Sequence, residues 1–304
     1  MRFIDAHLHT DMIEDVQLQK LVMMGMEAAV IPSPHMFIGT HDAETVVQLW
    51  ERFLTMETTT AKTLGFEAFT SISIPFFGVS RADAERCLER MPEFLKNERV
   101  VAMGEIGLDT GTEFEEWLFR EHLRLAGEHD LPVILHTPIR LAPQGPVVTP
   151  RVFEIVKEEG FPVERCVFDH AAEETMDFRM STGGMVGLSI CWDKMPPEVA
   201  ARIAIDHPDW RDRLMINSEL GGMGNVSGDL VKKLLELPEE VRVAAARRAP
   251  HRIAVYVTEV AQAFSAFYRD CKVIGAAEEG GDEDLRLALC ELTRRVIARC
   301  LDLL

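Results

Sequence analysis

The sequence predicts an α/β fold, a (β/α)8 TIM-type barrel, followed by a C-terminal all-α helical segment. Eight short β-type runs recur in about the first 220 residues, and helical spacing separates most of them. No strand-like run follows residue 228. Alternating strands and helices imply a parallel sheet, and eight such units match a barrel better than an open sheet. We therefore predict a barrel over residues 1–228 and a helical segment over residues 229–304.

The eight predicted strands are short apolar runs bounded by polar or turn-forming residues. Helical spacing is clearest before the fifth strand, at Leu118, His122, Leu125 and Ala126. The strands are expected at Arg2–His7, Ala28–Ile31, Ala68–Ile74, Val100–Ile106, Pro132–Leu135, Cys166–Phe168, Met185–Ser189 and Leu214–Ile216.

The last part of the chain has only helical periodicity. One apolar stripe is formed by Ile253, Val257, Val260, Phe264, Phe267 and Cys271, and a second by Leu285, Leu289, Leu292, Val296 and Cys300. We expect these two stripes to be the inner faces of two long helices.

The charge of the chain is concentrated in the predicted barrel. The net charge is −18, and the first 230 residues carry 20 basic against 38 acidic side chains. Residues 231–304 carry 12 of each. Because an acidic field repels polyanions, the barrel is not expected to present a broad nucleic-acid footprint.

The sequence suggests a cytoplasmic protein without a membrane span. It contains no apolar run of about 20 residues, and no signal peptide fits its start. The six cysteines are scattered and form no CxxC pair, which is typical of reduced thiols.

Histidine and acidic residues follow the predicted strands. His7 and His9 end the first run, where strand alternation puts both imidazoles on one face and lets them chelate one ion. The same strand-end position is occupied by Glu105, His136, His170 and Glu219. TIM-barrel enzymes build their sites on this face, and these residue types bind Zn²⁺, Mn²⁺ and similar ions. Each residue alone has a structural interpretation, but the whole set favours a metal site.

Residues 1–228 resemble the TatD-related branch of the amidohydrolase superfamily, a group of metal-dependent hydrolases. The resemblance rests on His-x-His in the first strand, Gly-Glu-Ile-Gly-Leu-Asp at 104–109, Leu-His-Thr-Pro at 135–138 and Asp-His at 169–170. It implies two divalent ions, Zn, Mn or Mg. By resemblance, His7 and His9 bind one ion, His136 and His170 bind the other, and Glu105 bridges them.

The resemblance also implies an acid after the eighth strand that binds the first ion and orients the attacking water. The family usually has Asp there, whereas this chain has Glu219. The extra methylene shifts the carboxylate by roughly 1 to 1.5 Å, which can cost about a hundredfold in rate. The expected chemistry is hydrolysis of a phosphoester, amide or lactone by a metal-bridging hydroxide. Glu105 and Glu219 are the expected catalytic residues, and Glu219 transfers the proton.

Two further residues are candidates for substrate contact. His35 follows the second run and faces the same end of the barrel, and Arg140 lies just beyond His136. Arg140 could hold an anionic substrate, either a small molecule or the end of a nucleic acid. The alternative for Arg140 is a solvated loop residue.

Residues from about 230 to 304 resemble part of the C-terminal anticodon-binding domain of arginyl-tRNA synthetases. The phrase from Phe264 to Cys271 is the most specific part. The chain lacks HIGH-type and KMSKS-type segments, so it is not expected to charge tRNA. The alternative function is therefore an RNA-associated binding protein with an inactive barrel. The sequence leaves open whether the tail contacts tRNA or only packs, and whether the chain forms a homo-oligomer.

Overall fold

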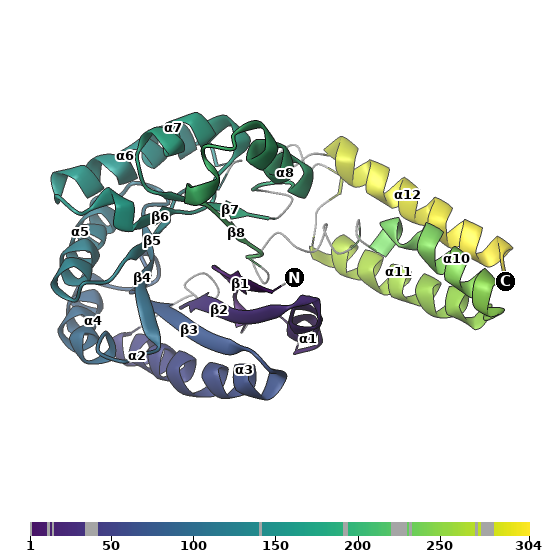
Figure 1. Ribbon diagram of the computed structural model, residues 1–304, viewed down its shortest axis with the longest axis horizontal. Helices are drawn as coiled ribbons and strands as arrows, with labels where there is room; N and C mark the ends of the chain where they lie inside the picture. Colours follow the sequence, from purple (N-terminus) through teal and green to yellow (C-terminus); the bar gives the residue numbers. More distant parts are fainter. Residues whose placement is uncertain are drawn as a thin grey trace. The chain divides into compact units, whose positions relative to one another are not determined.

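Eight parallel strands follow one another in sequence order around the N-terminal part of the computed structural model (Figure 1). All eight predicted strands are present, with ends shifted by a few residues, and the TIM-type barrel is confirmed. The strands are β1 (Phe3–Asp5), β2 (Met26–Pro32), β3 (Glu67–Ile72), β4 (Val100–Gly107), β5 (Val133–His136), β6 (Cys166–Phe168), β7 (Met185–Ser189) and β8 (Leu214–Asn217).

The structure describes residues 2–10, 13, 15–33, 42–139, 142–190, 194–219, 230, 233–270, 273–274 and 283–304. The chain divides into two compact units, Met1–Gly222 and Met223–Leu304. This division lies close to the predicted boundary near residue 228. Within the described residues, no helix is both long enough and apolar enough to cross a membrane.

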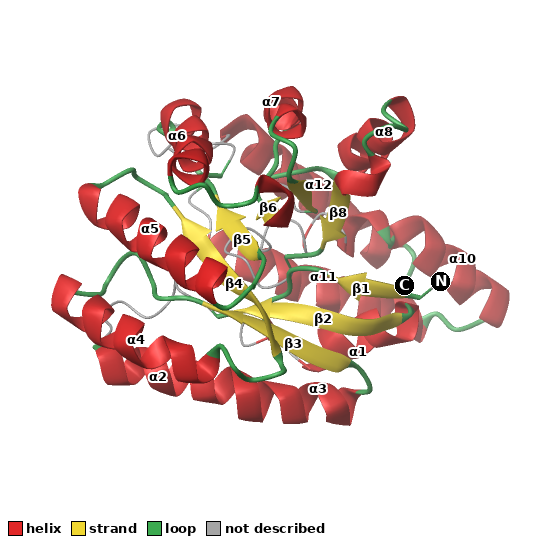
Figure 2. Ribbon diagram, turned by 60° about the vertical axis from the view of Figure 1, so that its left-hand side comes forward, coloured by secondary structure: helices red, strands yellow, loops and turns green. Residues whose placement is uncertain are grey.

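Helices surround the strands in the first unit (Figure 2). Side-chain caps start three of them, because Asp42, Ser80 and Thr112 accept hydrogen bonds from backbone N–H groups three residues ahead. The α-helices are α1 (Asp15–Met24), α2 (Ala43–Arg52), α3 (Thr58–Leu64), α4 (Arg81–Phe94), α5 (Glu113–Glu128), α6 (Gly145–Glu158), α7 (Met176–Ser181) and α8 (Pro197–Asp206). Single turns lie at Phe53–Glu57, Val163–Arg165, Glu173–Thr175 and Arg211–Arg213.

The register of the strands brings their carboxyl ends to one rim. Gly107 pairs with His136, Leu135 pairs with Phe168, and Ser189 pairs with Asn217. One backbone bond then links the segment after β8 to the segment after β1. Glu219 N donates to His7 O over 3.0 Å. Residues that follow different strands are therefore held at a similar level along the barrel axis.

The part of the second unit that the structure describes contains the helices α10 (Leu237–Arg247), α11 (His251–Asp270) and α12 (Glu283–Asp302). The predicted helical periodicity is confirmed, and Ile253, Val260 and Phe267 share a core with Leu289 and Val296. Tyr256 also belongs to this core, and its hydroxyl donates to Lys233 O over 2.7 Å. Leu292, on the second predicted stripe, is instead exposed.

The apolar layer between the strands and α5 should carry much of the barrel's stability. Phe119 on α5 is buried, whereas Val147 on α6 is exposed. We expect Phe119→Ala to lower the free energy of unfolding of the barrel by about 3–5 kcal/mol, since it removes a buried ring and leaves a cavity. Val147→Ala should change it by less than about 0.5 kcal/mol. Denaturant unfolding measures both, and equal effects would contradict this assignment of the core.

Candidate metal centre

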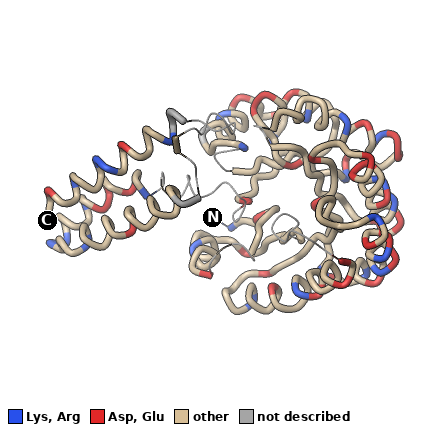
Figure 3. Tube along the Cα trace, turned by 180° about the vertical axis from the view of Figure 1, so that it is seen from behind, with Lys and Arg blue, Asp and Glu red and all other residues tan. Residues whose placement is uncertain are grey.

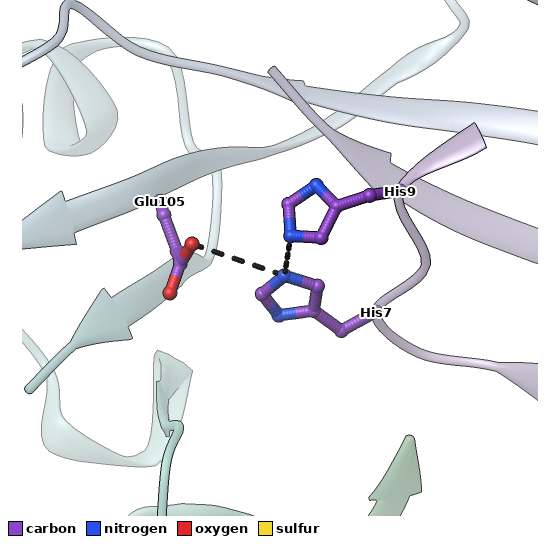
Figure 4. Close-up of side chains that lie close together, drawn as sticks. All are labelled: His7, His9 and Glu105. Carbon is purple, nitrogen blue, oxygen red and sulfur yellow. Dashed lines mark hydrogen bonds and ion pairs between the residues drawn. The ribbon is translucent and has the colours of Figure 1, made fainter. Parts of the chain in front are cut away.

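His7, His9 and Glu105 form the first of two groups of ligand-type side chains (Figure 4). His7 Nε2 lies 3.0 Å from His9 Nε2 and 3.8 Å from Glu105 Oε2. Two imidazole nitrogens bound to one tetrahedral zinc ion are about 3.3 Å apart, given Zn–N bonds of about 2.0–2.1 Å. The spacing of the two histidine nitrogens therefore suits a shared ion.

Glu105, His136 and His170 form the second group. Glu105 Oε1 lies 3.3 Å from His136 Nδ1 and 3.1 Å from His170 Nε2. Glu105 is thus common to both groups and directs one oxygen to each of them. The structure brings together five of the predicted ligands in the pairing that the sequence suggested, and their role as ligands stays a prediction.

The donor set and its unsatisfied atoms fit a pair of divalent cations. Four imidazoles and one carboxylate match the ligands that Zn²⁺ and Mn²⁺ accept. Among the described residues, buried Glu219 Oε2 has no hydrogen-bond partner, and buried His170 Nε2 lies 3.1 Å from Glu105 Oε1 and from Glu219 Oε1 without the alignment of a hydrogen bond to either. Buried polar atoms are normally paired, so these two atoms indicate ligands or partners of a bound species.

Asp169 orients the first group from outside. Its Oδ2 lies 2.6 Å from His7 Nδ1, and its Oδ1 accepts from Asn217 Nδ2 over 2.8 Å. The contact with Asp169 leaves His7 Nε2 free to face His9 and Glu105. Gly187 on β7 makes room for this carboxylate, because a Cβ atom there would overlap Asp169 Oδ1.

Arg179 on α7 supports the second group in the same way. This buried guanidinium donates to Asp169 O over 3.0 Å, to Thr137 Oγ1 over 2.8 Å and to His170 O over 3.3 Å. His170 Nδ1 in turn lies 2.8 Å from Thr137 O, which leaves its Nε2 for an ion. Burial lowers the pKa of Arg179 to about 10, so it stays charged at neutral pH.

A third support comes from the start of α5. The buried carboxylate of Glu115 accepts from the backbone N–H groups of Asp109, Thr110 and Gly111 over 2.8–2.9 Å. These bonds fix the loop after β4. Asp109 Oδ1 lies 3.4 Å from His136 Nε2, and this hydrogen bond lowers the pKa of Asp109.

The buried acids of the site are held ionised by their neighbours. Burial alone raises the pKa of Glu105, but His170 and His7 outweigh it and hold that pKa well below its usual range. Asp169 shows the same balance, with His7 lowering its pKa against burial. Asp5 differs, because burial raises its pKa despite its hydrogen bond with Ser218 N.

Glu219 lies beside the second group rather than inside either one. Its Oε1 lies 3.1 Å from His170 Nε2 and pairs with the ammonium of Lys194. The resemblance implied that this acid binds the first ion together with His7 and His9. Among the described residues, neither group of ligand-type side chains includes Glu219.

A cavity of about 320 Å³ opens beside His170. It is formed by the loops after β5 and β6 and by the starts of α6 and α7. Apolar side chains such as Ile139, Pro146 and Phe178 line most of it, with Thr149 and Glu174 as polar members. The predicted substrate residues His35 and Arg140 both lie outside the described residues.

Sequence reasoning missed three residues that support the site: Asp169, Arg179 and Lys194. Asp169 stands next to His170 in the Asp-His motif, so the sequence did contain a signal for it. Arg179 and Lys194 belong to segments without a recognisable motif. Only the packing of α7 and of the segment after β7 against the rim brings them to the site.

Comparisons with known proteins divide at the same place as the two units. Residues 4–207 match the family model described as TatD related DNase. An uncharacterized metal-dependent hydrolase of Methanocaldococcus jannaschii is 30% identical over 72% of this chain and 84% of its own length. A TatD-like protein from Archaeoglobus fulgidus has 27% sequence identity to this chain, and its crystal structure matches with a TM-score of 0.61. The match covers 71% of this chain and 85% of that chain.

Residues 223–304 match a second family model, the DALR anticodon binding domain. An arginine–tRNA ligase from Salinibacter ruber is 45% identical over 64 residues. That match covers 21% of this chain and 11% of the ligase, so the chain spans only a small part of that enzyme. Both predicted resemblances are confirmed.

Removing the charge of Asp169 tests whether it supports a metal site. We expect Asp169→Asn to weaken divalent-metal binding by about 10- to 100-fold, because His7 loses the carboxylate that orients its ring. A competition titration with a chromophoric chelator measures this affinity. Asp177→Asn, an exposed change on α7, is the matched control and should leave the affinity unchanged. Equal affinities in the two variants would show that Asp169 has no such role.

Proposed function

The chain belongs to the family of TatD-related DNases and metal-dependent hydrolases, and on that premise we propose that its barrel uses two divalent ions to hydrolyse a small substrate. The bond cleaved would be a phosphoester, an amide or a lactone. One observation carries the proposal. Two His-His-Glu groups share the buried Glu105 at the carboxyl-terminal rim of the barrel.

His7 and His9 would hold one ion, His136 and His170 the other, and Glu105 would bridge them. Zn²⁺ or Mn²⁺ suits four imidazoles better than Mg²⁺, which prefers oxygen ligands and retains water. When bound, two such ions supply a nucleophilic water near neutral pH and polarise the bond to be cleaved.

Glu219 is the proposed proton carrier. Its Oε2 is buried and, among the described residues, has no hydrogen-bond partner, so it is open to a water or an ion. A carboxylate in hydrogen-bond reach of the nucleophile can take its proton and pass it to the leaving group. Glu105 holds the two groups together, because each of its oxygens faces a different one.

The charges of the barrel favour a small substrate or a nucleic-acid end over a long polyanion. Acidic and basic residues lie mainly on the outer helices of the barrel (Figure 3). Many of the arginines there are neutralised by acids. Examples are the pairs Arg90–Glu44, Arg120–Glu158, Arg124–Glu128 and Arg151–Glu116. Phosphate binding along a duplex needs unpaired basic groups.

The cavity beside His170 supports the same choice. Its volume of about 320 Å³ lies at the lower end of the range for small-molecule pockets. Its apolar lining, with Pro146 and Phe178, would accept an apolar part of the substrate next to the second ion. A substrate with an apolar leaving group is therefore the first to test.

Metal content and turnover together test the proposed hydrolase. We expect the purified protein to bind close to two equivalents of Zn or Mn and to hydrolyse at least one member of a panel of phosphodiesters, phosphomonoesters, amides and lactones. His136→Ala should lower the metal content towards one equivalent and kcat/KM by more than about 100-fold, which exceeds the loss expected from a residue that only orients a metal ligand.

His129→Ala is the matched histidine control for that experiment. His129 caps the carboxyl end of α5, and its removal should change neither metal content nor turnover. Metal analysis that finds none in the wild-type protein, even after reconstitution, would falsify the proposal.

A second candidate function, contact with tRNA, is favoured by the anticodon-binding-domain match over residues 223–304. A basic face on this unit would have to be formed by its arginines, which include Arg247, Arg248, Arg252, Arg294, Arg295 and Arg299. Arg252 pairs with Glu240, and Arg294 and Arg295 both pair with Glu291. The exposed Arg247, Arg248 and Arg299 remain the best candidates for phosphate contact.

Filter binding with total tRNA at two salt concentrations tests this second function. If the helical unit binds tRNA, retention should fall as salt rises, and replacing Arg247 and Arg299 with Gln should lower the salt slope by about 1 to 2. Arg242→Gln, which removes an arginine paired with Glu239, is the control. Retention that does not respond to salt would leave the helices as a structural element.

A further inference from the structure

Lys194 is a buried cation in contact with the candidate metal centre. It follows β7, is 8% exposed, and its ammonium pairs with Oε1 of Glu219. Burying an ammonium costs free energy unless an anion compensates it. Asp5, Glu105 and Asp169 are also buried at this rim, so the acids outnumber Lys194 and Arg179. A lysine is therefore tolerated here, but tolerance alone does not explain why it pairs with Glu219.

Hydrogen bonds at Glu219 and at the preceding residue hold the backbone of Glu219 in an unusual conformation. Its φ of +43° lies in the left-handed region, which is strained for a residue with a Cβ atom. Two hydrogen bonds maintain this conformation. Glu219 N donates to His7 O over 3.0 Å, and Ser218 N donates to Asp5 Oδ1 over 3.1 Å.

A fixed backbone does not fix the carboxylate of Glu219, which needs a contact of its own to hold its orientation. Glutamate has one more rotatable bond than aspartate, so a fixed backbone leaves its carboxylate free to swing. The Lys194 ammonium takes Oε1, which also lies 3.1 Å from His170 Nε2. Oε2 is left buried and, among the described residues, without a hydrogen-bond partner.

We propose that Lys194 is a positioning residue whose ion pair with Oε1 of Glu219 aims Oε2 at the water used in hydrolysis. The inference rests on the proposed hydrolase function. It would also account for a glutamate at the position where the resemblance implies an aspartate. The lysine fixes the end of the longer side chain and keeps one oxygen from binding an ion.

Replacing Lys194 should separate turnover from metal binding. In Lys194→Met, kcat should fall by roughly 10- to 100-fold with little change in KM, because the Glu219 carboxylate is no longer held in one orientation. Divalent-metal affinity of the metal-free protein should rise severalfold, since a cation no longer repels the ions. A residue that only stabilises the fold would not give these opposite directions.

Four further variants, one of them a double variant, make the test specific. Lys194→Arg keeps the charge and should recover much of kcat. Glu219→Gln removes the partner, and adding Lys194→Met to it should cause little further loss. Lys62→Met, an exposed change on α3, should behave like the wild type. Metal affinity is measured by chelator competition, and the melting temperature of each variant is followed in parallel.

The outcomes distinguish this inference from the function on which it rests. If the wild type binds metal and turns over but Lys194→Met matches it, the inference is wrong and the hydrolase stands. The inference is also wrong if Lys194→Met lowers kcat as much in the Glu219→Gln background as in the wild type. It is likewise wrong if both Lys194 variants lose metal affinity together with melting temperature. A wild type that binds no metal and cleaves nothing overturns both.

Discussion

A single buried carboxylate, that of Asp169, connects the elements that carry the candidate metal centre. Its oxygens contact His7 after β1 and Asn217 on β8, and its carbonyl accepts from Arg179 on α7. The carboxylate fits only because Gly187 on β7 has no side chain. A buried charge without partners would be costly, so these contacts are both the condition for burying Asp169 and the means of orienting the site.

Strained backbone at the rim is a second constraint on the site. His170 and Glu219 both have positive φ, +58° and +43°, which costs non-glycine residues of order 1–3 kcal/mol each. Such strained conformations persist where hydrogen bonds to the surrounding structure hold the backbone in place. Arg179 donates to His170 O, and Glu219 N donates to His7 O. The rim thus holds two side chains in directions that a relaxed strand end would not give them.

The two units differ in the number and placement of their charged side chains. The barrel is strongly acidic outside, where ion pairs neutralise many arginines, and it concentrates buried charge at one rim. The helical unit is balanced in charge, and its described core around Val260 and Phe267 is mainly apolar, with the polar groups of Tyr256 and Thr293 bonded to backbone carbonyls. The same division separates the two family matches, TatD related DNase for residues 4–207 and the DALR anticodon binding domain for residues 223–304.

The sequence alone predicted the eight strands, the change to helices after residue 228 and five residues that now lie together at the rim. It could do so because strand alternation and strand-end positions are local properties, and because parallel strands end at a common face. It did not predict the roles of Arg179 and Lys194, or that Glu219 lies beside the second group. Those depend on which loops and helices pack over the rim, a long-range outcome of burial and charge compensation that no local pattern encodes.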